Sequence, residues 1–386
     1  MIYEKAQKIS DKLIKIRRDL HQIPELEFDV FETAKYIENQ LDLLGIQHYR
    51  LANTGIVGII KGKNNDKTLL IREDIDALLI TELNDIPYKS KNVGKMHACG
   101  HDAHATCLIG AAMILKDMEL SGDVKLVFQP AEEGDGGALP MILDGVMENP
   151  KVSAAISLHV EPLAKVGTLL FRDNAIAASP DEFSIVIGGV GGHGACPKDC
   201  NNPIIPASHL IQKLNTIVAD NSMSDDDCVV SVCMVNAGTS YNIIPDKIKI
   251  SGTVRSLSED IRSKIEKLIE KYADAVSTEY NCSYDYKFIR SFPPLINDKK
   301  INDIVVSASK KIPQFNNISY LEKAPMLGDD FAYFAELVPS SYFKLGVGND
   351  EINSPLHSPN FNIDENALSL GAAILAQTVI DYFENE

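Results

Sequence analysis

The chain has 386 residues, of which 45% are apolar; 54 acidic and 37 basic residues give a formal net charge of −17. This length predicts two domains and a sizeable buried core. The negative charge argues against nucleic acid and anionic membranes as partners, because both are themselves negatively charged.

The sequence gives two indications of a cytoplasmic protein. No apolar run is long enough to span a bilayer, and residues 1–8 lack the apolar core of a signal peptide. The seven cysteines are scattered and odd in number, which is typical of reduced thiols. We therefore expect a cytoplasmic location.

The first part of the chain predicts an α/β domain. Residues 4–20 and 29–44 have the apolar spacing of amphipathic helices, and Gly45 follows the second. Short apolar runs then alternate with helical stretches, which is typical of a largely parallel sheet. The predicted strands are 68–72, 124–128 and 154–158, and the predicted helices are 103–116 and 138–147.

The pattern changes after about residue 180. The order strand, helix, two strands, helix, strand is that of a ferredoxin-like domain, and the prolines at 293–294 then interrupt the chain. We predict that 180–290 is a domain inserted into a larger one made of 1–179 and 291–386. The elements predicted in it are strands 181–187, 228–235, 247–254 and 284–289 and helices 204–219 and 258–278.

Polar groups follow three of the predicted strands. Asp74 and Asp76 follow the first, Glu132 and Glu133 the second, and His159 the third. Open α/β sheets place their sites beyond the carboxyl ends of strands. These side chains are therefore predicted to share one crevice.

The segment His97-Ala-Cys-Gly-His-Asp-Ala-His104 brings one thiol and three imidazoles into eight residues. A lone cysteine or histidine is usually structural, but here Cys99 and His101 flank a glycine that lets both turn toward one point. Thiolate and imidazole are ligands that zinc prefers. His97 and His104 are weaker candidates, and His104 is suited to orienting a ligand from the next helical turn.

The adjacent carboxylates Glu132 and Glu133 lie at a predicted strand-to-helix turn. Adjacent acids are usually a solvated surface pair, but neighbouring residues at such a turn can point in different directions. One carboxylate can then bind metal while the other moves protons, as hydrolysis by a metal-bound water requires. His159 is a further candidate ligand because it lies at the end of a predicted strand. The sequence around His357 by itself indicates only a histidine in a loop.

The run Gly189-Val-Gly-Gly-His-Gly194 matches G-x-G-x-x-G and suggests a dinucleotide-binding dehydrogenase as an alternative. That fingerprint must open a helix, but this run continues into Pro197 and Pro203, which disfavour one. The glycines are better suited to a loop that presents His193. Cys196 and Cys200 lack nearby ligands and are interpreted as plain thiols.

Over nearly its whole length the sequence resembles a known family of two-metal amidohydrolases and carboxypeptidases. The family includes aminoacylase, hippurate hydrolase, indole-acetyl-amino-acid hydrolase and N-acetyldiaminopimelate deacetylase. The stretches that carry the resemblance, in family order, are 17–26 (RRDLHQIPEL), 72–78 (REDIDAL), 96–104 (MHACGHDAH), 128–134 (FQPAEEG), 192–195 (GHGA), 242–245 (NIIP), 252–255 (GTVR) and 356–358 (LHS).

The resemblance implies a two-metal exopeptidase-like catalytic domain of the α/β class with a mixed, mainly parallel sheet. It also implies an inserted ferredoxin-like α+β domain that acts as a lid and forms a homodimer. The implied cofactors are two divalent ions per subunit, zinc or manganese, with cobalt or nickel as further options. The implied metal ligands are Cys99, His101, Glu133, His159 and His357.

The resemblance also assigns the remaining roles. Glu132 would be the general base and Asp74 would support the site. His193 would reach the partner subunit's site and stabilise the oxyanion, while Asn242 and Arg255 would hold the substrate's carboxylate. The expected substrate is therefore a small N-acyl amino acid.

Some positions depart from the family pattern. Glu73 and Leu79 stand where alanine and proline are usual, Lys198 stands in place of histidine, and residues 327–331 read Leu-Gly-Asp-Asp-Phe where Gly-Ser-Glu-Asp-Phe is usual. These positions surround the substrate more than the metals, so they leave specificity open.

The sequence is compatible with four functions. We expect metal-dependent hydrolysis of N-acyl amino acids, of the aminoacylase or N-acetyl-amino-acid deacetylase type, with N-acetyldiaminopimelate among the candidate substrates. A metallo-carboxypeptidase acting on short peptides is the alternative within the same class. A structural-zinc or binding protein without catalysis and the dehydrogenase suggested by the glycine run are the others.

Overall fold

A computed structural model describes residues 2–64, 66–134, 136–224 and 227–384 of the chain. The chain forms two compact units. The first contains the chain up to Asn174, the segment Ile296–Glu322 and the chain from Asp330 onward; the second contains Ala175–Leu295 and Lys323–Asp329. The second unit thus begins before residue 180, ends after residue 290, and includes a short later segment that the sequence did not indicate.

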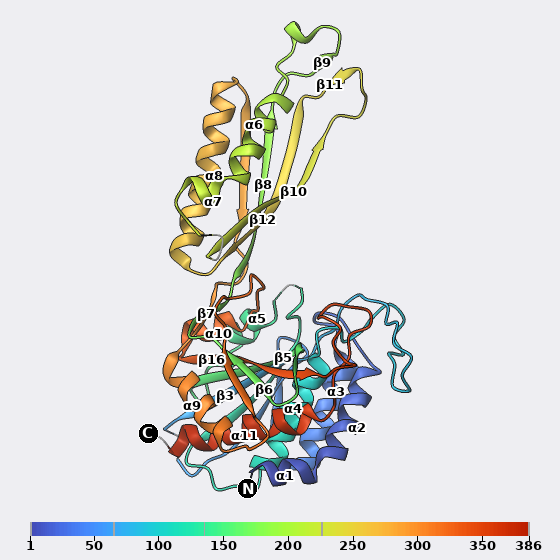
Figure 1. Cartoon of the computed structure of the whole chain (residues 1–386), viewed down its shortest axis with the longest axis vertical. Helices are drawn as coiled ribbons and strands as arrows, with labels where there is room; N and C mark the ends of the chain where they lie inside the picture. Colours follow the sequence, from blue (N-terminus) through green and yellow to red (C-terminus); the bar gives the residue numbers. More distant parts are fainter. Residues whose placement is uncertain (1, 65, 135, 225–226, 385–386) are drawn as a thin grey trace. The chain divides into compact units, whose positions relative to one another are not determined.

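The described part of the first unit contains a mixed, mainly parallel sheet (Figure 1), as predicted. Its strand order is β1-β2-β4-β3-β5-β16-β6-β15. The pairs β3–β4, β3–β5, β5–β16 and β6–β15 are parallel. The strands are β1 (Gln47–Leu51), β2 (Gly55–Ile60), β3 (Thr68–Asp74), β4 (Asp123–Gln129), β5 (Ala154–Lys165), β6 (Thr168–Phe171), β15 (Asn317–Tyr320) and β16 (Ser340–Gly348).

The helices of the first unit differ from the prediction at two places. The helix predicted over 4–20 is interrupted at Ile9, and the one predicted over 138–147 already ends at Leu143. Gly45 ends α3 in the left-handed conformation, with a φ of 69°, as its position in the sequence indicated. The helices are α1 (Ile2–Lys8), α2 (Ser10–His21), α3 (Phe31–Leu44), α4 (His101–Leu115), α5 (Ala138–Leu143), α9 (Lys299–Lys310), α10 (Ala332–Leu337) and α11 (Ala367–Glu384).

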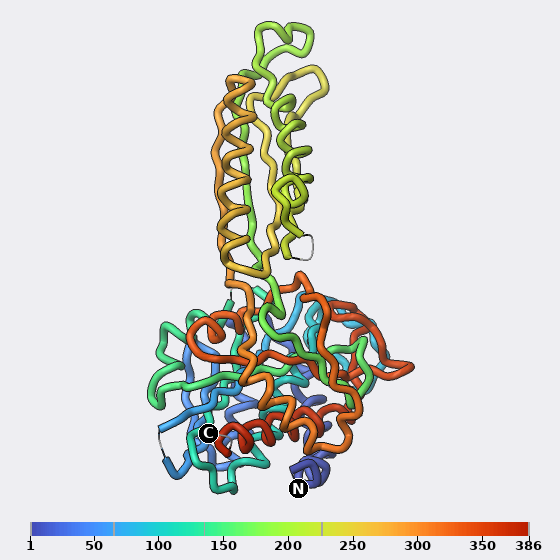
Figure 2. The backbone as a smooth tube through the Cα atoms, turned by 60° about the vertical axis from the view of Figure 1, so that its left-hand side comes forward, coloured from blue at the N-terminus to red at the C-terminus, as the bar shows by residue number. Residues whose placement is uncertain are grey.

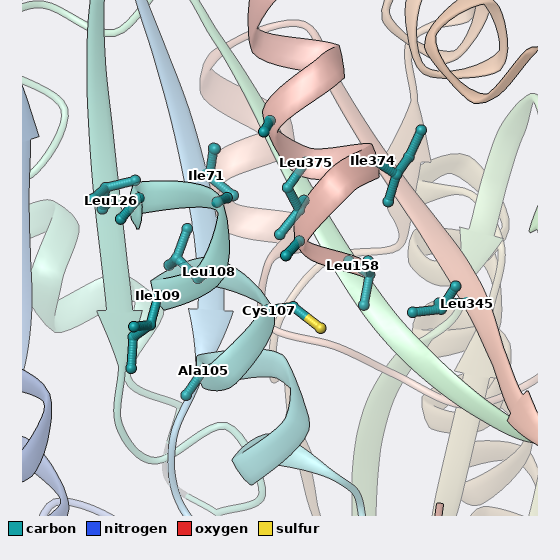
Figure 3. Close-up of a cluster of buried hydrophobic side chains, with 14 of the residues drawn as sticks. Ile71, Ala105, Cys107, Leu108, Ile109, Leu126, Leu158, Leu345, Ile374 and Leu375 are labelled. Carbon is teal, nitrogen blue, oxygen red and sulfur yellow. The ribbon is translucent and has the colours of Figure 1, made fainter. Parts of the chain in front are cut away.

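The core of the first unit lies between one face of the sheet and helices α4 and α11 (Figure 3). Leu108 of α4 and Leu375 of α11 lie there with Ile71 of β3 and Leu158 of β5. Successive side chains of a strand point to opposite faces. His159, the neighbour of Leu158, therefore lies on the face of the sheet away from this core.

The second unit has a four-stranded antiparallel sheet in the order β10-β12-β8-β13, which is the ferredoxin-like arrangement. Figure 2 shows its long helices running along the sheet. Arg262 of α8 forms two hydrogen bonds, of 2.8 and 2.6 Å, with the buried Asp181 carboxylate of β8 and so joins helix to sheet. The elements are β8 (Ser179–Gly188), β10 (Cys228–Ala237), β12 (Lys247–Ser256), β13 (Ser283–Ile289), α6 (Ile204–Asn215), α7 (Ile217–Asp220) and α8 (Glu259–Glu279).

Short elements complete the chain. β9 (Gly192–His193) pairs with β11 (Ile243–Ile244), and β7 (Asn174–Ala177) pairs with β14 (Leu295–Asn297). The glycine run leads from β9 into the 3-10 helix Pro197–Asp199, and not into the α-helix that a dinucleotide fingerprint needs. Among the described residues, no helix has both the length and the apolar character needed to cross a bilayer.

Candidate metal centre

Helix α4 begins at His101, directly after a glycine that the local geometry requires. Gly100 has a φ of 91°, and a Cβ atom built on it would lie 2.4 Å from Cγ2 of Val160. Only glycine adopts this conformation without strain and fits this contact. Cys99 and His101 flank it, and both are buried.

The ligand atoms of all five predicted ligands fall into overlapping clusters. Within each cluster these atoms lie within 4.8 Å of one another. Cys99 belongs to two clusters, one with His101 and His159 and the other with Glu133 and His357. The five residues, which come from four separated stretches of the chain, therefore lie around one place in the first unit.

Three distances define the centre. Sγ of Cys99 lies 3.4 Å from Nε2 of His159. Oε1 of Glu133 lies 3.2 Å from Nε2 of His357 and 3.8 Å from Nε2 of His101. Each contact joins atoms that can donate lone pairs to a cation, and among the described residues Glu133 Oε1 and both ring nitrogens of His101 are buried without a hydrogen-bond partner.

Hydrogen bonds distinguish the roles of His159 and His104. Nδ1 of His159 lies 2.7 Å from its acceptor, the Val160 carbonyl, so Nε2 keeps its lone pair on the side of Cys99. The Val160 N–H donates to Nε2 of His104 at 2.9 Å, so Nδ1 of His104 carries the proton and donates it to Asp74 at 2.6 Å. His104 has no lone pair left for a metal and supports the site instead.

Two aspartates at the end of β3, Asp74 within the strand and Asp76 just after it, contact the ligands. Asp74 contacts His104 and lies 3.7 Å from Nε2 of His101. Asp76 places Oδ1 3.3 Å from Nδ1 of His101, and its Oδ2 accepts the Glu133 N–H at 3.1 Å. The sequence places Asp76 after the predicted strand but assigns it no role. Its spacing of two residues from Asp74 is the signal that could have indicated one.

Asp74 is itself fixed by a buried network that the sequence did not indicate. Arg72 donates to Asp74 at 2.8 Å, to Gln129 at 2.9 Å and to Asp330 at 2.6 Å. Gln129 also donates to both oxygens of Asp330. Glu73, which stands where the family usually has alanine, is fully buried between Arg72 and Asp74 in β3, and its Oε1 accepts the N–H of Leu158 at 3.1 Å.

The electrostatics of the centre favour a cation. Burial raises the pKa of the Cys99 thiol, and the Glu133, Glu132 and Asp74 carboxylates raise it further, well above its usual value. Burial lowers the pKa of His101, but nearby carboxylates, Asp74 first, raise it to about 10. A divalent cation would neutralise this concentrated negative charge and favour the thiolate, so the donor set fits a metal site.

Glu132 lies beside the ligands and forms one of the clusters with His101 and Glu133. Its Oε2 is 4.0 Å from Nε2 of His101, and its side chain is 10% exposed. His97 is also buried next to the centre, but it belongs to none of the clusters, and burial lowers its pKa to about 3. The sequence makes His97 and His104 equally weak candidates for direct metal ligands. In the structure His104 supports the site through Asp74, whereas His97 belongs to none of the clusters.

The other predicted site residues belong to the second unit. His193 of β9 and Asn242, directly before β11, are neighbours, because the Gly194 N–H donates to the Asn242 carbonyl at 2.8 Å. Strand β12 begins at Lys247, and Arg255 lies near its other end, where it pairs with Pro180. Lys247 and Arg255 are thus about 26 Å apart along the strand at ~3.3 Å per residue, and β9 and β11 lie beyond the Lys247 end (Figure 1). The second unit therefore does not bring Arg255 together with His193 and Asn242.

Comparison with known proteins gives a consistent result. The model of peptidase family M20/M25/M40 matches residues 70–381. The chain is 38% identical over 364 residues to N-acetyl-L-cysteine deacetylase of Bacillus subtilis, covering 93% of this chain and 85% of that protein. It is 36% identical over 388 residues to thermostable carboxypeptidase 2 of Saccharolobus solfataricus, covering 98% and 97%.

A solved structure is similar over the full length of the chain. It is the crystal structure of a dinuclear metal-binding peptidase of the M20 family from Bacillus subtilis. The TM-score is 0.87 at 32% sequence identity, and the match covers 98% of this chain and 100% of that one.

Proposed function

Because the chain belongs to peptidase family M20/M25/M40 and is a metal-dependent amidohydrolase, we propose that it hydrolyses the amide bond of N-acyl amino acids. The observation that carries this proposal is the gathering of Cys99, three histidines and Glu133 with Glu132 beside them. The similarity to a deacetylase of an N-acetyl amino acid supports the substrate class.

The cofactor in this proposal is a pair of divalent ions. The overlapping clusters and the dinuclear structural neighbour support two of them. Cys99, His101, Glu133, His159 and His357 would hold them. The thiolate of Cys99 favours zinc, whereas the carboxylate and imidazoles also suit manganese, cobalt or nickel.

The protein's own groups account for the proton transfers. When bound, the metals supply a water whose pKa is lowered to about 7, and they polarise the amide carbonyl. Glu132 accepts the proton of the attacking water at its carboxylate and delivers it to the leaving nitrogen. Asp76 and Asp74 keep His101 in place during these steps, because each lies within 4 Å of that ring.

The second unit completes the site in a homodimer. His193 would stabilise the oxyanion, and Asn242 and Arg255 would hold the free carboxylate of the substrate. One small substrate cannot touch both ends of the β12 strand, so the His193 end and Arg255 are proposed to come from different subunits. Exposed apolar side chains in the second unit, Met234, Val235, Tyr241 and Ile243, support a dimer contact there.

A metallo-carboxypeptidase is the second candidate, because a carboxypeptidase matches this chain over nearly its full length. Such an enzyme would use the same metals and the same base, with a peptide bond in place of the acyl amide. The two functions differ only in the group on the carbonyl side of the scissile bond, which is a simple acyl group in one case and an amino acid or peptide in the other.

A substrate panel separates the two functions. N-acetyl and N-benzoyl amino acids, dipeptides and tripeptides would be assayed with metal-stripped protein reconstituted with zinc, manganese, cobalt or nickel. We expect higher kcat/KM for the acyl amino acids than for the peptides with the same C-terminal residue. The reverse order would support the carboxypeptidase, and hydrolysis of neither class would contradict both proposals.

A further inference from the structure

The ligand His357 lies on a segment without regular secondary structure, between the end of β16 and the start of α11. Its φ is 61° and its side chain is 51% exposed, so its own packing does not fix its position. Its ring contacts Glu133 at 3.2 Å. Its backbone N–H donates to the carbonyl of Ala98, the residue before the ligand Cys99, at 2.8 Å.

Further along, the same segment is fixed to the rest of the first unit at two places. The side chain of Asn84 donates to the carbonyl of Phe361 at 2.8 Å. Nη1 of Arg17 donates to Oδ1 of Asn362 at 3.3 Å. The Arg17 side chain is fully buried in helix α2.

The opposite side of Arg17 contacts the start of helix α4. Its Nε lies 2.9 Å from Oδ2 of Asp102, which directly follows the ligand His101 and is also fully buried. Nδ1 of His21 lies 2.7 Å from the same oxygen. Arg17 therefore bridges the start of helix α4, where His101 lies, and the segment that carries His357.

A second route joins the same two parts. Nε2 of His21 lies 3.3 Å from Oε1 of Glu82, and this oxygen accepts a hydrogen bond from Asn84 at 3.1 Å. Asn84 in turn bonds Phe361. The buried charges of this network are paired, Arg17 and His21 facing Asp102 and Glu82, so the network can exist inside the protein at a tolerable desolvation cost.

From this geometry we propose that Arg17 is a positioning residue of the metal centre, which sets the separation between His101 at the start of α4 and His357. The proposal rests on the proposed function, since it concerns the same two ions. The planar guanidinium of Arg17 faces Asp102 with Nε as an ion pair and bonds Asn362 with Nη1, from positions fixed in one plane, whereas a lysine ammonium is a single point charge. Arg17→Lys thus keeps the buried charge but loses the bridge.

The test compares Arg17→Lys with Arg18→Lys. Arg18 is the next residue, is 42% exposed and forms a bidentate pair with Glu365, which also lies 3.7 Å from Nη1 of Arg17. The control therefore changes an arginine of the same helix that shares this neighbour, but it leaves the contacts of Arg17 with Asp102 and Asn362 in place. Metal-stripped proteins would be titrated with Mn²⁺ by calorimetry. For Arg17→Lys we expect about 10–100-fold weaker binding of one ion, as is typical when a group that orients a ligand is lost.

Two further readouts distinguish positioning from general stability. The thermal midpoint of metal-stripped Arg17→Lys should match that of Arg18→Lys, and excess Mn²⁺ should restore most of kcat in Arg17→Lys. If that variant fails to fold, Asn362→Ala removes the other end of the bridge, together with the bond from the Ile363 N–H to the same oxygen, and should weaken Mn²⁺ binding in the same direction.

Wild-type Mn²⁺ affinity in both Arg17→Lys and Asn362→Ala would overturn the positioning role while leaving the proposed function intact. A wild-type protein that binds fewer than two ions would overturn the proposed function, and the positioning role with it.

Discussion

The Glu133 carboxylate and the His357 imidazole meet through a 3.2 Å contact between Oε1 and Nε2, although they come from distant parts of the chain. The adjacent Glu132 does not share this contact, and its Oε2 lies 4.0 Å from Nε2 of His101. The contact with His357 supports the roles that the family resemblance implies, in which Glu133 binds metal and Glu132 transfers protons.

Glu132→Gln should keep two bound ions and lose most of its turnover. Glutamine has a similar shape but cannot accept the proton of the attacking water, and such a base typically contributes about 10²–10⁴-fold to the rate. Metal content by mass spectrometry and kcat on the preferred substrate would be measured. Glu38→Gln, at a surface pair with Arg50, is the control, and normal turnover in Glu132→Gln would remove Glu132 from its proposed role.

Cys99→Ala should reduce the metal content below two ions per chain. Cys99 belongs to two of the ligand clusters, so its loss weakens the binding of both ions. Cys107→Ala is a matched control, because Cys107 is equally buried in helix α4 but belongs to no cluster. Equal metal content in the two variants would contradict the role of Cys99 as a ligand.

Removing the metals with a chelator should abolish activity and leave the protein folded. The first unit has a large apolar core between its sheet and helices α4 and α11, which does not depend on a cation. Far-UV circular dichroism and a cooperative thermal transition would be recorded before and after chelation. A protein that unfolds on chelation would instead fit a structural metal site.

Mixing two inactive variants should restore activity if His193 acts across a dimer. Glu132→Gln lacks the base and His193→Ala lacks the oxyanion donor, but a mixed dimer contains one site with both groups. Activity after unfolding and refolding the mixture, well above either variant alone, is the expected result. Activity no higher than that of the parents, in a mixture shown by mass to form mixed dimers, would place His193 in its own subunit's site or outside catalysis.

The stabilisation that His21 provides should decrease as the pH rises. Burial lowers the pKa of His21, but the Asp102 and Glu82 carboxylates raise it overall, above its usual value of 6.5. A raised folded pKa means that the charged ring stabilises the fold fully below pH 6.5 and loses this effect as the pH passes the folded value. Urea unfolding of metal-stripped protein should therefore show a difference between wild type and His21→Gln that shrinks with increasing pH.

His48→Gln on strand β1 is the control for that comparison, because His48 contacts no buried carboxylate. A difference for His21→Gln that is constant or grows with pH would contradict the assigned charge.

Much of the parallel sheet could be predicted because its strands are short and apolar. The runs at 68–72 and 124–128 lie within β3 and β4, since both strands are buried on both faces. The strand predicted over 154–158 continues to Lys165 in the structure, so His159 lies within β5 and not at its end. Polar and proline residues after Leu158 concealed this extension.

The supporting residues of the site could not be predicted because their partners are far away in sequence. Asp330 bonds Arg72 and Arg17 pairs with Asp102, and no local pattern indicates either contact. His357 was indicated only by the family resemblance, since its loop carries no periodic signal. The cytoplasmic location and the lack of nucleic-acid and membrane partners stay predictions.

The tight fit around Gly100 restricts how this centre can be engineered or can evolve. A methyl group at that position would overlap the Val160 side chain, and the backbone there has a φ of 91°. Libraries that aim at a different metal preference can change the side chains at positions 99 and 101. The glycine between these positions and their spacing must be left unchanged.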